Sequence, residues 1–180
     1  MDNQIQLFGK TFIPYISEKE IEELITTIAN QLNKDFSGKH PLFIGVLNGS
    51  FMFVSDLMKK MEIDVELSFV KVESYYGMAS SGKVTELIGL SADLNNRHVV
   101  ILEDIVDTGN TIGELLYLIG AEQPASLSIA TLLLKPDVFN KKYTVHYVGK
   151  NIPNKFVVGY GLDYNESGRN LKSIYQVAEE

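Results

Sequence analysis

Three carboxylates stand close together at residues 103–107, directly after a run of apolar residues. Residues 99–102 are apolar and rich in β-branched side chains, which is typical of a strand buried on both faces of a sheet. Glu103 and Asp104 follow where that strand should end, and their side chains point to opposite faces if the strand continues. Because buried carboxylates are costly unless they are paired or bind a cation, this pair predicts a site open to solvent or to a metal ion.

A polar turn comes next, and it is formed by Asp107, Thr108, Gly109, Asn110 and Thr111. The turn leads into apolar residues at helical spacing over 112–119, so it is predicted to be a helix N-terminus. The unpaired backbone N–H groups of such a terminus, with the threonine hydroxyls, form a cradle for a phosphate or another anion. The alternative is that Asp107 and Thr108 only cap the helix, and that Glu103 and Asp104 are solvated loop residues. The combination of strand, carboxylates, turn and helix favours a ligand that carries both phosphate and hydroxyl groups.

The elements that must position these residues follow from the hydrophobic pattern. Strands alternate with helices, which predicts an α/β fold in one domain over residues 1–180, with a mainly parallel central sheet flanked by helices. Helices are expected over 17–38, 51–61 and 112–119, and strands over 41–47, 63–72, 83–90, 99–102, 127–134, 144–148 and 156–160. The polar loop 73–82 is typical of a mobile lid. Ligands in such sheets bind beyond the carboxyl ends of the strands.

Composition narrows the class of protein. The chain has 180 residues, of which 45% are hydrophobic and 22% are charged, which is typical of a globular domain. A net charge of -7 gives no electrostatic support for binding to nucleic acid or to an anionic membrane. The chain has no cysteine, its amino terminus does not resemble a secretory signal, and no apolar run approaches the length of a membrane span. We therefore expect a cytoplasmic protein.

Residues 99–111 resemble the phosphoribosyl-pyrophosphate motif of the type I phosphoribosyltransferases. Further segments resemble the hypoxanthine-guanine phosphoribosyltransferase family within that group, in the same order along the chain: residues 45–51, 71–76, 132–135 and 152–166. The resemblance implies the type I phosphoribosyltransferase fold, with a small hood and a lid loop. It also implies transfer of the 5-phosphoribosyl group from phosphoribosyl pyrophosphate to hypoxanthine and also to guanine, with Mg²⁺ required. A homodimer or homotetramer is expected.

The resemblance assigns roles around the transferred sugar. The 5-phosphate should lie against Thr108, Gly109, Asn110 and Thr111, and the ribose hydroxyls against Glu103 and Asp104, directly or through Mg²⁺. Asp107 also borders the phosphoribosyl group and should be the catalytic base that accepts a proton from the purine. The metal would be held by Glu103, Asp104 and Asp163.

The remaining roles concern the purine, the pyrophosphate and the lid. Lys135 should donate to the purine's O6, Phe156 should stack on its ring, and Val157 and Asp163 complete the purine site. Asn48, Gly49 and Arg169 are implied to bind pyrophosphate, and Ser74 and Tyr75 to form the lid. Taken alone, Lys135 and Arg169 would be solvated, while Phe156 and Val157 would be strand core.

One departure from the family concerns Asn48, where the family commonly carries lysine or arginine. Asn48 removes that charge but keeps the backbone, in which the family has a non-proline cis peptide, so we expect an altered affinity for the donor. Two other functions stay open: an RNA-binding regulator with the same fold and a non-catalytic phosphoribosyl-pyrophosphate-binding module. The preference among hypoxanthine, guanine and xanthine is also open, because backbone groups are expected to distinguish them.

Overall fold

The structure is a computed structural model, which describes residues 4–73, 86–88 and 92–178. The helices are α1 (Glu18–Asp35), α2 (Phe51–Met58) and α3 (Asn110–Ala121). The strands are β1 (Ile5–Leu7), β2 (Lys10–Ile16), β3 (Leu42–Leu47), β4 (Glu66–Glu73), β5 (Glu86–Ile88), β6 (His98–Val106), β7 (Ser126–Leu134), β8 (Tyr147–Asn151), β9 (Val157–Val158) and β10 (Ile174–Val177). None of the helices in these parts of the chain is long and apolar enough to cross a membrane.

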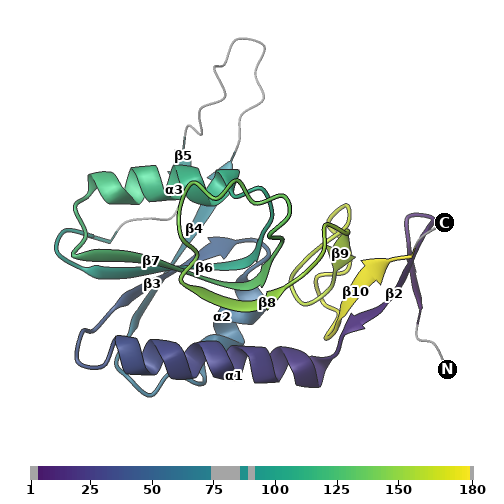
Figure 1. The fold of residues 1–180 in the computed structure, drawn as a ribbon, viewed down its shortest axis with the longest axis horizontal. Coiled ribbons are helices and arrows are strands. Elements are labelled where there is room, and N and C mark those ends of the chain that lie inside the picture. The colour runs from purple at the N-terminus through teal and green to yellow at the C-terminus, as the bar shows by residue number, and fades with distance from the viewer. Residues whose placement is uncertain (1–3, 74–85, 89–91, 179–180) are drawn as a thin grey trace, which may run out of the picture.

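The main sheet has six strands in the order β5-β4-β3-β6-β7-β8 (Figure 1). Strands β4, β3, β6, β7 and β8 are parallel, and only β5 is antiparallel, to β4. This confirms the mainly parallel α/β sheet predicted from the sequence. Because parallel strands end at one edge, the residues that follow β3, β6 and β7 come together there.

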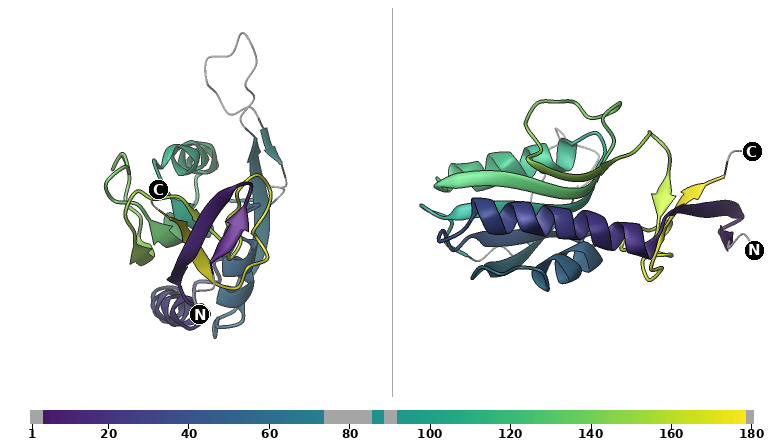
Figure 2. Two further views of the ribbon diagram at one scale, coloured as in Figure 1. Left: turned by 90° about the vertical axis from the view of Figure 1, so that its right-hand side faces the viewer. Right: turned by 60° about the horizontal axis from the view of Figure 1, so that its bottom comes forward.

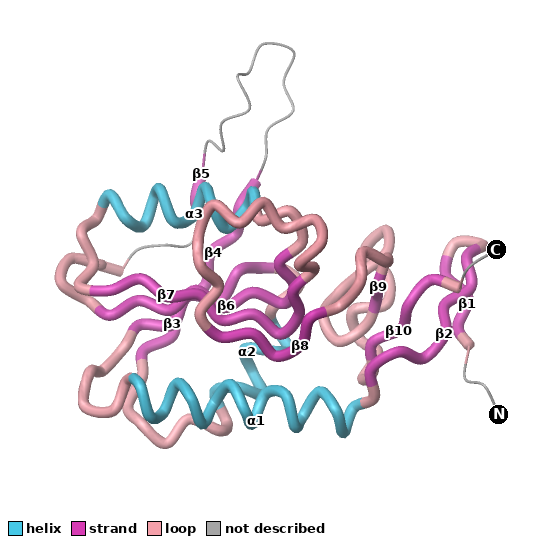
Figure 3. Tube along the Cα trace, viewed as in Figure 1, coloured by secondary structure: helices cyan, strands magenta, loops and turns pink. Residues whose placement is uncertain are grey.

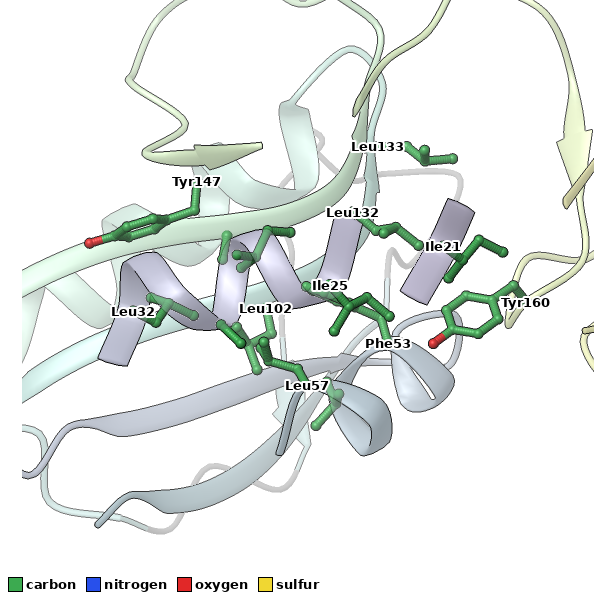
Figure 4. Packing of buried hydrophobic residues seen from close by; sticks show 14 of the residues in the cluster. Ile21, Ile25, Leu32, Phe53, Leu57, Leu102, Leu132, Leu133, Tyr147 and Tyr160 are labelled. Carbon is green, nitrogen blue, oxygen red and sulfur yellow. The ribbon is translucent and has the colours of Figure 1, made fainter. Parts of the chain in front are cut away.

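Helices cover both faces of the main sheet. Helices α1 and α2 lie on one face and α3 on the other, as the views in Figures 1 and 2 agree. Successive side chains of β6 point to opposite faces of the sheet. Val100 and Leu102 pack in the hydrophobic cluster with α1 and α2, and Val99 and Ile101 pack in the cluster with α3. Figure 4 shows Leu102 among the side chains of the first cluster. The apolar run of β6 is therefore explained by burial on both faces.

Helix α1 forms as its sequence predicts. The Ser17 hydroxyl caps it by accepting a hydrogen bond from the N–H of Glu20 at 3.2 Å. Its apolar stripe is completely buried against the sheet and consists of Ile21, Ile25, Ile28, Ala29 and Leu32. Burying a side chain of this size stabilises the fold by about 1.5–3 kcal/mol. The stripe therefore fixes α1 beneath the strands that carry the site.

A second, smaller sheet stands beyond the edge of the main sheet, and we call it the hood. It has the order β1-β2-β10-β9, with antiparallel neighbours. In Figure 3 it is the group of strands on the right. The family resemblance implied a small hood, but the sequence pattern did not predict β1, β2 or β10.

Several predicted boundaries were wrong. Strand β6 continues to Val106 instead of ending at residue 102, because its pairing with β7 extends to the Val106 and Leu134 partners. Strand β8 begins three residues later than predicted, and β9 keeps only two residues of the predicted 156–160. The predicted lid residues Ser74 and Tyr75 lie outside the described residues.

Candidate active site

A cavity of about 370 Å³ lies where the ends of the main-sheet strands face the hood. It combines residues that follow β3, β6 and β7 with residues of the hood side. Its lining consists of Asn48, Gly49, Asp104, Ile105, Asp107, Lys135, Phe156, Val157, Leu162, Asp163 and Arg169. The structure thus brings together the residues predicted to meet purine and pyrophosphate, together with two of the three predicted carboxylates.

The turn at residues 107–111, here called the phosphate loop, leads from β6 into α3. Gly109 is the N-cap of α3 and has a φ of +87°, a left-handed conformation that glycine adopts without strain. Among the described side chains, that of Thr108 accepts a long hydrogen bond of 3.5 Å from the N–H of Asn110, and the other N–H groups of the first turn of α3 are open to an anion. Thr108, Asn110 and Thr111 are exposed beside them. The prediction of a helix N-terminus is confirmed. Of the two residues in the capping alternative, Thr108 contacts an N–H of the helix and Asp107 does not.

Asp107 forms an ion pair with Lys135 instead. The Lys135 Nζ donates to Asp107 Oδ2 at 2.8 Å. The Lys135 side chain is only 8% exposed, whereas that of Asp107 is 49% exposed. Lys135 follows β7 and is held there by its backbone N–H, which donates to the carbonyl of Val106 at 3.0 Å. Lys135 is therefore a buried cation whose ammonium borders the cavity beside a carboxylate, and not a solvated strand end.

Glu103 and Asp104 lie within β6, and their side chains diverge as alternation predicts. Asp104 lines the cavity next to Gly49, and burial raises its pKa to about 6 although the N–H of Ile105 and the charge of Arg169 oppose the shift. Glu103 lies outside the described lining of that cavity, and burial, with the charge of Asp104, raises its pKa well above the usual range. Its Oε2 atom is buried and has no hydrogen-bond partner among the described residues. The alternative that both are solvated loop residues is wrong.

The carboxylates of the cavity suit a metal ion that protein and substrate bind together. They suit less well a metal ion bound by protein side chains alone. Asp104 and Asp163 both line the cavity. Within residues 4–73, 86–88 and 92–178, no cluster of three or more acidic or histidine side chains is arranged to hold an ion. Mg²⁺ characteristically takes one or two carboxylates and completes its shell with waters and substrate oxygens. The buried Asp104 carboxylate is compatible with such an ion.

The hood supplies the aromatic wall of the cavity. Phe156 is 47% exposed although it is a large apolar side chain, so it is not strand core. Its ring contacts Tyr164 edge to face, with centroids 5.5 Å apart, and Phe12 at 6.3 Å. These contacts leave part of the Phe156 ring free for a planar ligand. Val157 beside it is buried, which agrees with the alternative that its side chain belongs to the strand core.

Backbone and arginine groups form the other wall. The Leu47-Asn48 peptide bond is cis, as the family resemblance implied. Arg169 is anchored by its Nη1, which donates to the carbonyl of Gly161 at 3.0 Å, and by its Nη2, which pairs with Asp163 Oδ1 at 2.8 Å. Arg169 is therefore held at the cavity and is not a freely solvated side chain.

Sequence reasoning missed three contributors to this site. Ile105 and Leu162 line the cavity, and Gly161 packs against the backbone carbonyl of Gly49. A Cβ at Gly161 would collide with that carbonyl, and its φ of +95° is also unfavourable for other residues. The pair of glycines at 159 and 161 was the available signal, although as a nucleotide-binding motif it is incomplete.

Gly161→Ala is expected to destabilise the protein by about 1–3 kcal/mol, because Gly49 must move to admit the Cβ. Urea unfolding measures the effect. Gly120→Ala is the matched control, since a Cβ there meets nothing within 4 Å and alanine favours the helix. Equal stability of the two variants would contradict the close packing of Gly161 on Gly49.

Comparison with known proteins agrees with this geometry. Residues 16–165 match the family model described as the phosphoribosyl transferase domain. The chain is 42% identical over 166 residues to the hypoxanthine-guanine phosphoribosyltransferase of Streptococcus pneumoniae, covering 92% of each chain. A crystal structure of a hypoxanthine phosphoribosyltransferase from Staphylococcus aureus matches with a TM-score of 0.83 and 38% identity, over 92% of this chain and 90% of that one.

The similarity extends to a more distant organism. The hypoxanthine phosphoribosyltransferase of Trypanosoma cruzi matches with a TM-score of 0.83 and 33% identity, over 93% of this chain and 97% of that one. The matched region contains the phosphate loop, Lys135 and Phe156. The chain belongs to the hypoxanthine-guanine phosphoribosyltransferase family.

Proposed function

We propose that this protein transfers the 5-phosphoribosyl group from phosphoribosyl pyrophosphate to hypoxanthine and also to guanine, forming IMP or GMP and pyrophosphate in purine salvage. The observation that carries the proposal is the single cavity that holds the Asp107 and Lys135 pair, the Phe156 ring and Arg169, beside an uncapped helix N-terminus. Such a cavity suits a planar base at one wall and a polyanion at the other. Its family membership supports the same reaction.

The donor would lie across the end of β6. Its 5-phosphate accepts hydrogen bonds from the amides and hydroxyls of the phosphate loop, and its ribose hydroxyls meet Glu103 and Asp104. The backbone of Asn48 and Gly49, with Arg169, binds the pyrophosphate. Asp104 and Asp163 would hold Mg²⁺, whose charge would neutralise the pyrophosphate oxygens, whereas the predicted ligand Glu103 lies outside the described lining of the cavity.

The acceptor would lie between Phe156 and Lys135. The Lys135 ammonium donates to the purine's O6 and repels an amino group at that position, which disfavours adenine. The ring stacks on Phe156 and its edge meets the backbone of Val157, with Asp163 at the same wall. N9 of the purine attacks C1′ of the ribose, the C1′ to pyrophosphate bond breaks with its electron pair on the pyrophosphate, and Asp107 accepts the proton from N7.

The carboxylates of β6 would stabilise the positive charge of the transition state. As the bond to pyrophosphate breaks, positive charge develops on the ribose, as in glycoside hydrolysis. Fixed negative groups at that place lower the barrier because they need no reorganisation during the reaction. In this proposal the negative groups are Glu103 and Asp104 of β6. Ser74 and Tyr75 would close over the site and exclude water.

The assembly and location that we propose follow the family: a homodimer or homotetramer in the cytoplasm, with no nucleic acid or membrane partner. An RNA-binding regulator is less well supported, because the buried Lys135 and the Phe156 ring suit a 6-oxopurine. The relatives at 41–42% identity are named as enzymes.

A steady-state assay with Mg²⁺ and phosphoribosyl pyrophosphate tests the proposal against hypoxanthine, guanine, xanthine, adenine and uracil. We expect turnover of hypoxanthine and guanine, little turnover of adenine or uracil, and loss of all turnover in EDTA that excess Mg²⁺ restores. Xanthine as the preferred acceptor would change the assigned substrate but not the reaction. Turnover of adenine or uracil alone would overturn the assignment of Lys135, and no turnover with any base would overturn the proposal.

A further inference from the structure

The loop after β7 returns to the phosphate loop and contacts it at three successive residues. We call residues 139–143 of this loop the buttress. The backbone N–H of Asn140 donates to the carbonyl of Thr108 at 3.1 Å, and its side-chain amide reaches Asn110 Oδ1 at 3.4 Å. The hydroxyl of Tyr143 donates to the carbonyl of Gly109 at 2.6 Å. Two of these three hydrogen bonds are accepted by backbone carbonyls of the phosphate loop.

These hydrogen bonds determine where the anion-binding amides point. A trans peptide unit is planar, and its C=O and N–H point in opposite directions. Holding the carbonyl of Thr108 therefore orients the N–H of Gly109, and holding the carbonyl of Gly109 orients the N–H of Asn110. The N–H of Asn110 also donates to the Thr108 hydroxyl, at the long distance of 3.5 Å. The carbonyl of Gly109 also accepts the first helical bond of α3, from Gly113 at 2.9 Å. The Tyr143 hydroxyl adds a second restraint on the same atom.

Packing reinforces the same contact. A Cβ on Gly109 would lie 2.5 Å from the Tyr143 hydroxyl and 2.7 Å from the Phe139 ring, so these side chains occupy the space that glycine leaves. The two rings contact each other edge to face with centroids 5.1 Å apart. An open hollow of about 850 Å³ adjoins Gly109, Asn140 and Tyr143. If the contacts of the buttress were lost, few neighbouring atoms would therefore be close enough to support the phosphate loop.

The buttress is also joined to other parts of the site. The N–H of Phe139 donates to the carbonyl of Lys135 at 3.1 Å, so the buttress begins on the turn that carries the buried lysine. Burial, together with the charge of Glu103, raises the pKa of Tyr143 to about 12. The hydroxyl therefore keeps its proton and remains a donor at neutral pH.

We propose that Tyr143 is a positioning residue that holds the phosphate loop in the shape that binds the donor's 5-phosphate. Tyr143 would act through Gly109 and would not touch the substrate. The proposal rests on the proposed function, because it takes the phosphate loop to be the 5-phosphate site. Its effect would fall on binding of the phosphorylated donor and not on the purine or on the chemical step.

Tyr143→Phe is the direct test, because it keeps the ring and removes only the hydroxyl. We expect the KM for phosphoribosyl pyrophosphate to rise about three- to tenfold, as loss of one hydrogen bond implies, with kcat within about twofold. The KM for hypoxanthine should not change. Tyr147→Phe is the matched control, since its hydroxyl donates to Asp35 at 3.0 Å and the change removes the same group away from the phosphate loop.

A second measurement makes the result independent of turnover. Calorimetric titration with ribose 5-phosphate, without metal, should give a Kd that is about three- to tenfold weaker for Tyr143→Phe than for the wild type or Tyr147→Phe. Equal Kd and KM values in all three proteins would overturn the proposal, as would a parallel rise in the KM for hypoxanthine. If the wild type binds ribose 5-phosphate but turns over no base, the proposed function is overturned. The Kd values for ribose 5-phosphate then decide this inference alone. No ribose 5-phosphate binding by a wild type that turns over hypoxanthine would overturn this inference and leave the proposed function standing.

Discussion

Asp107→Asn is expected to lower kcat by about 100- to 10,000-fold, the usual contribution of general-base catalysis, while the KM for phosphoribosyl pyrophosphate changes little. The amide cannot accept the N7 proton, but its oxygen still accepts a hydrogen bond from Lys135, so the shape of the cavity persists. In the proposed function the donor's 5-phosphate is bound by the amides of α3, and the Asp107 side chain makes its described bond to Lys135 instead. Steady-state kinetics with hypoxanthine, together with calorimetric binding of the donor, separate the two effects.

Asp137→Asn is the matched control for this change. Asp137 is exposed and lies on the turn that follows Lys135, so the substitution removes one negative charge near the site without touching the cavity lining. It should leave kcat within about twofold of the wild type, as is usual for an exposed position. An Asp107→Asn enzyme with wild-type kcat would remove Asp107 as the base.

Lys135→Met is expected to lower kcat/KM for hypoxanthine by about 10- to 100-fold and to reduce the preference for hypoxanthine over adenine. A hydrogen bond from a charged donor is worth about 1.5–3 kcal/mol, and in the proposed function Lys135 makes it only to an oxygen at C6 of the purine. Methionine retains most of the volume of the buried stem. Because Asp107 is 49% exposed, it can be hydrated after the change, which limits any loss of stability.

The measurement for Lys135→Met is the ratio of kcat/KM for hypoxanthine to that for adenine. Lys172→Met, at an exposed position on the hood side, controls for the loss of one positive charge and should keep the wild-type ratio. An undiminished ratio in Lys135→Met would show that another group reads the purine at C6. In that case the ion pair with Asp107 would be structural.

The main sheet was predictable because local patterns specify it. The apolar runs of β3, β6 and β7 and the helical spacing of α1 to α3 each reflect burial against a neighbouring layer. Strand ends were harder to predict, because pairing between distant segments sets them. The register of β7 with β6 carries β6 through Glu103 and Asp104 to Val106, although two carboxylates suggested an end.

The hood was not predictable from the same patterns. Strand β2 contains Pro14, and β10 is only four residues long, so neither gives a clear alternating signal. They become strands by pairing with each other, in a register that aligns Ile16 with Ile174. The motif residues of the site were predictable, whereas Tyr143 was not, because its hydrogen bond spans 34 residues and lies in a loop without regular structure.

That pairing of Ile16 with Ile174 has a consequence for synthesis of the protein. The ribosome makes the chain from its amino terminus, whereas a domain folds as a unit. A chain that has reached Asn151 contains the strands of the main sheet, the phosphate loop and Lys135, but it lacks Phe156 and the inner hood strand β10. Strand β2 therefore has no inner neighbour until one of the last strands has been made. Completion of the hood, and of the cavity wall that contains Phe156, thus depends on the last part of the chain.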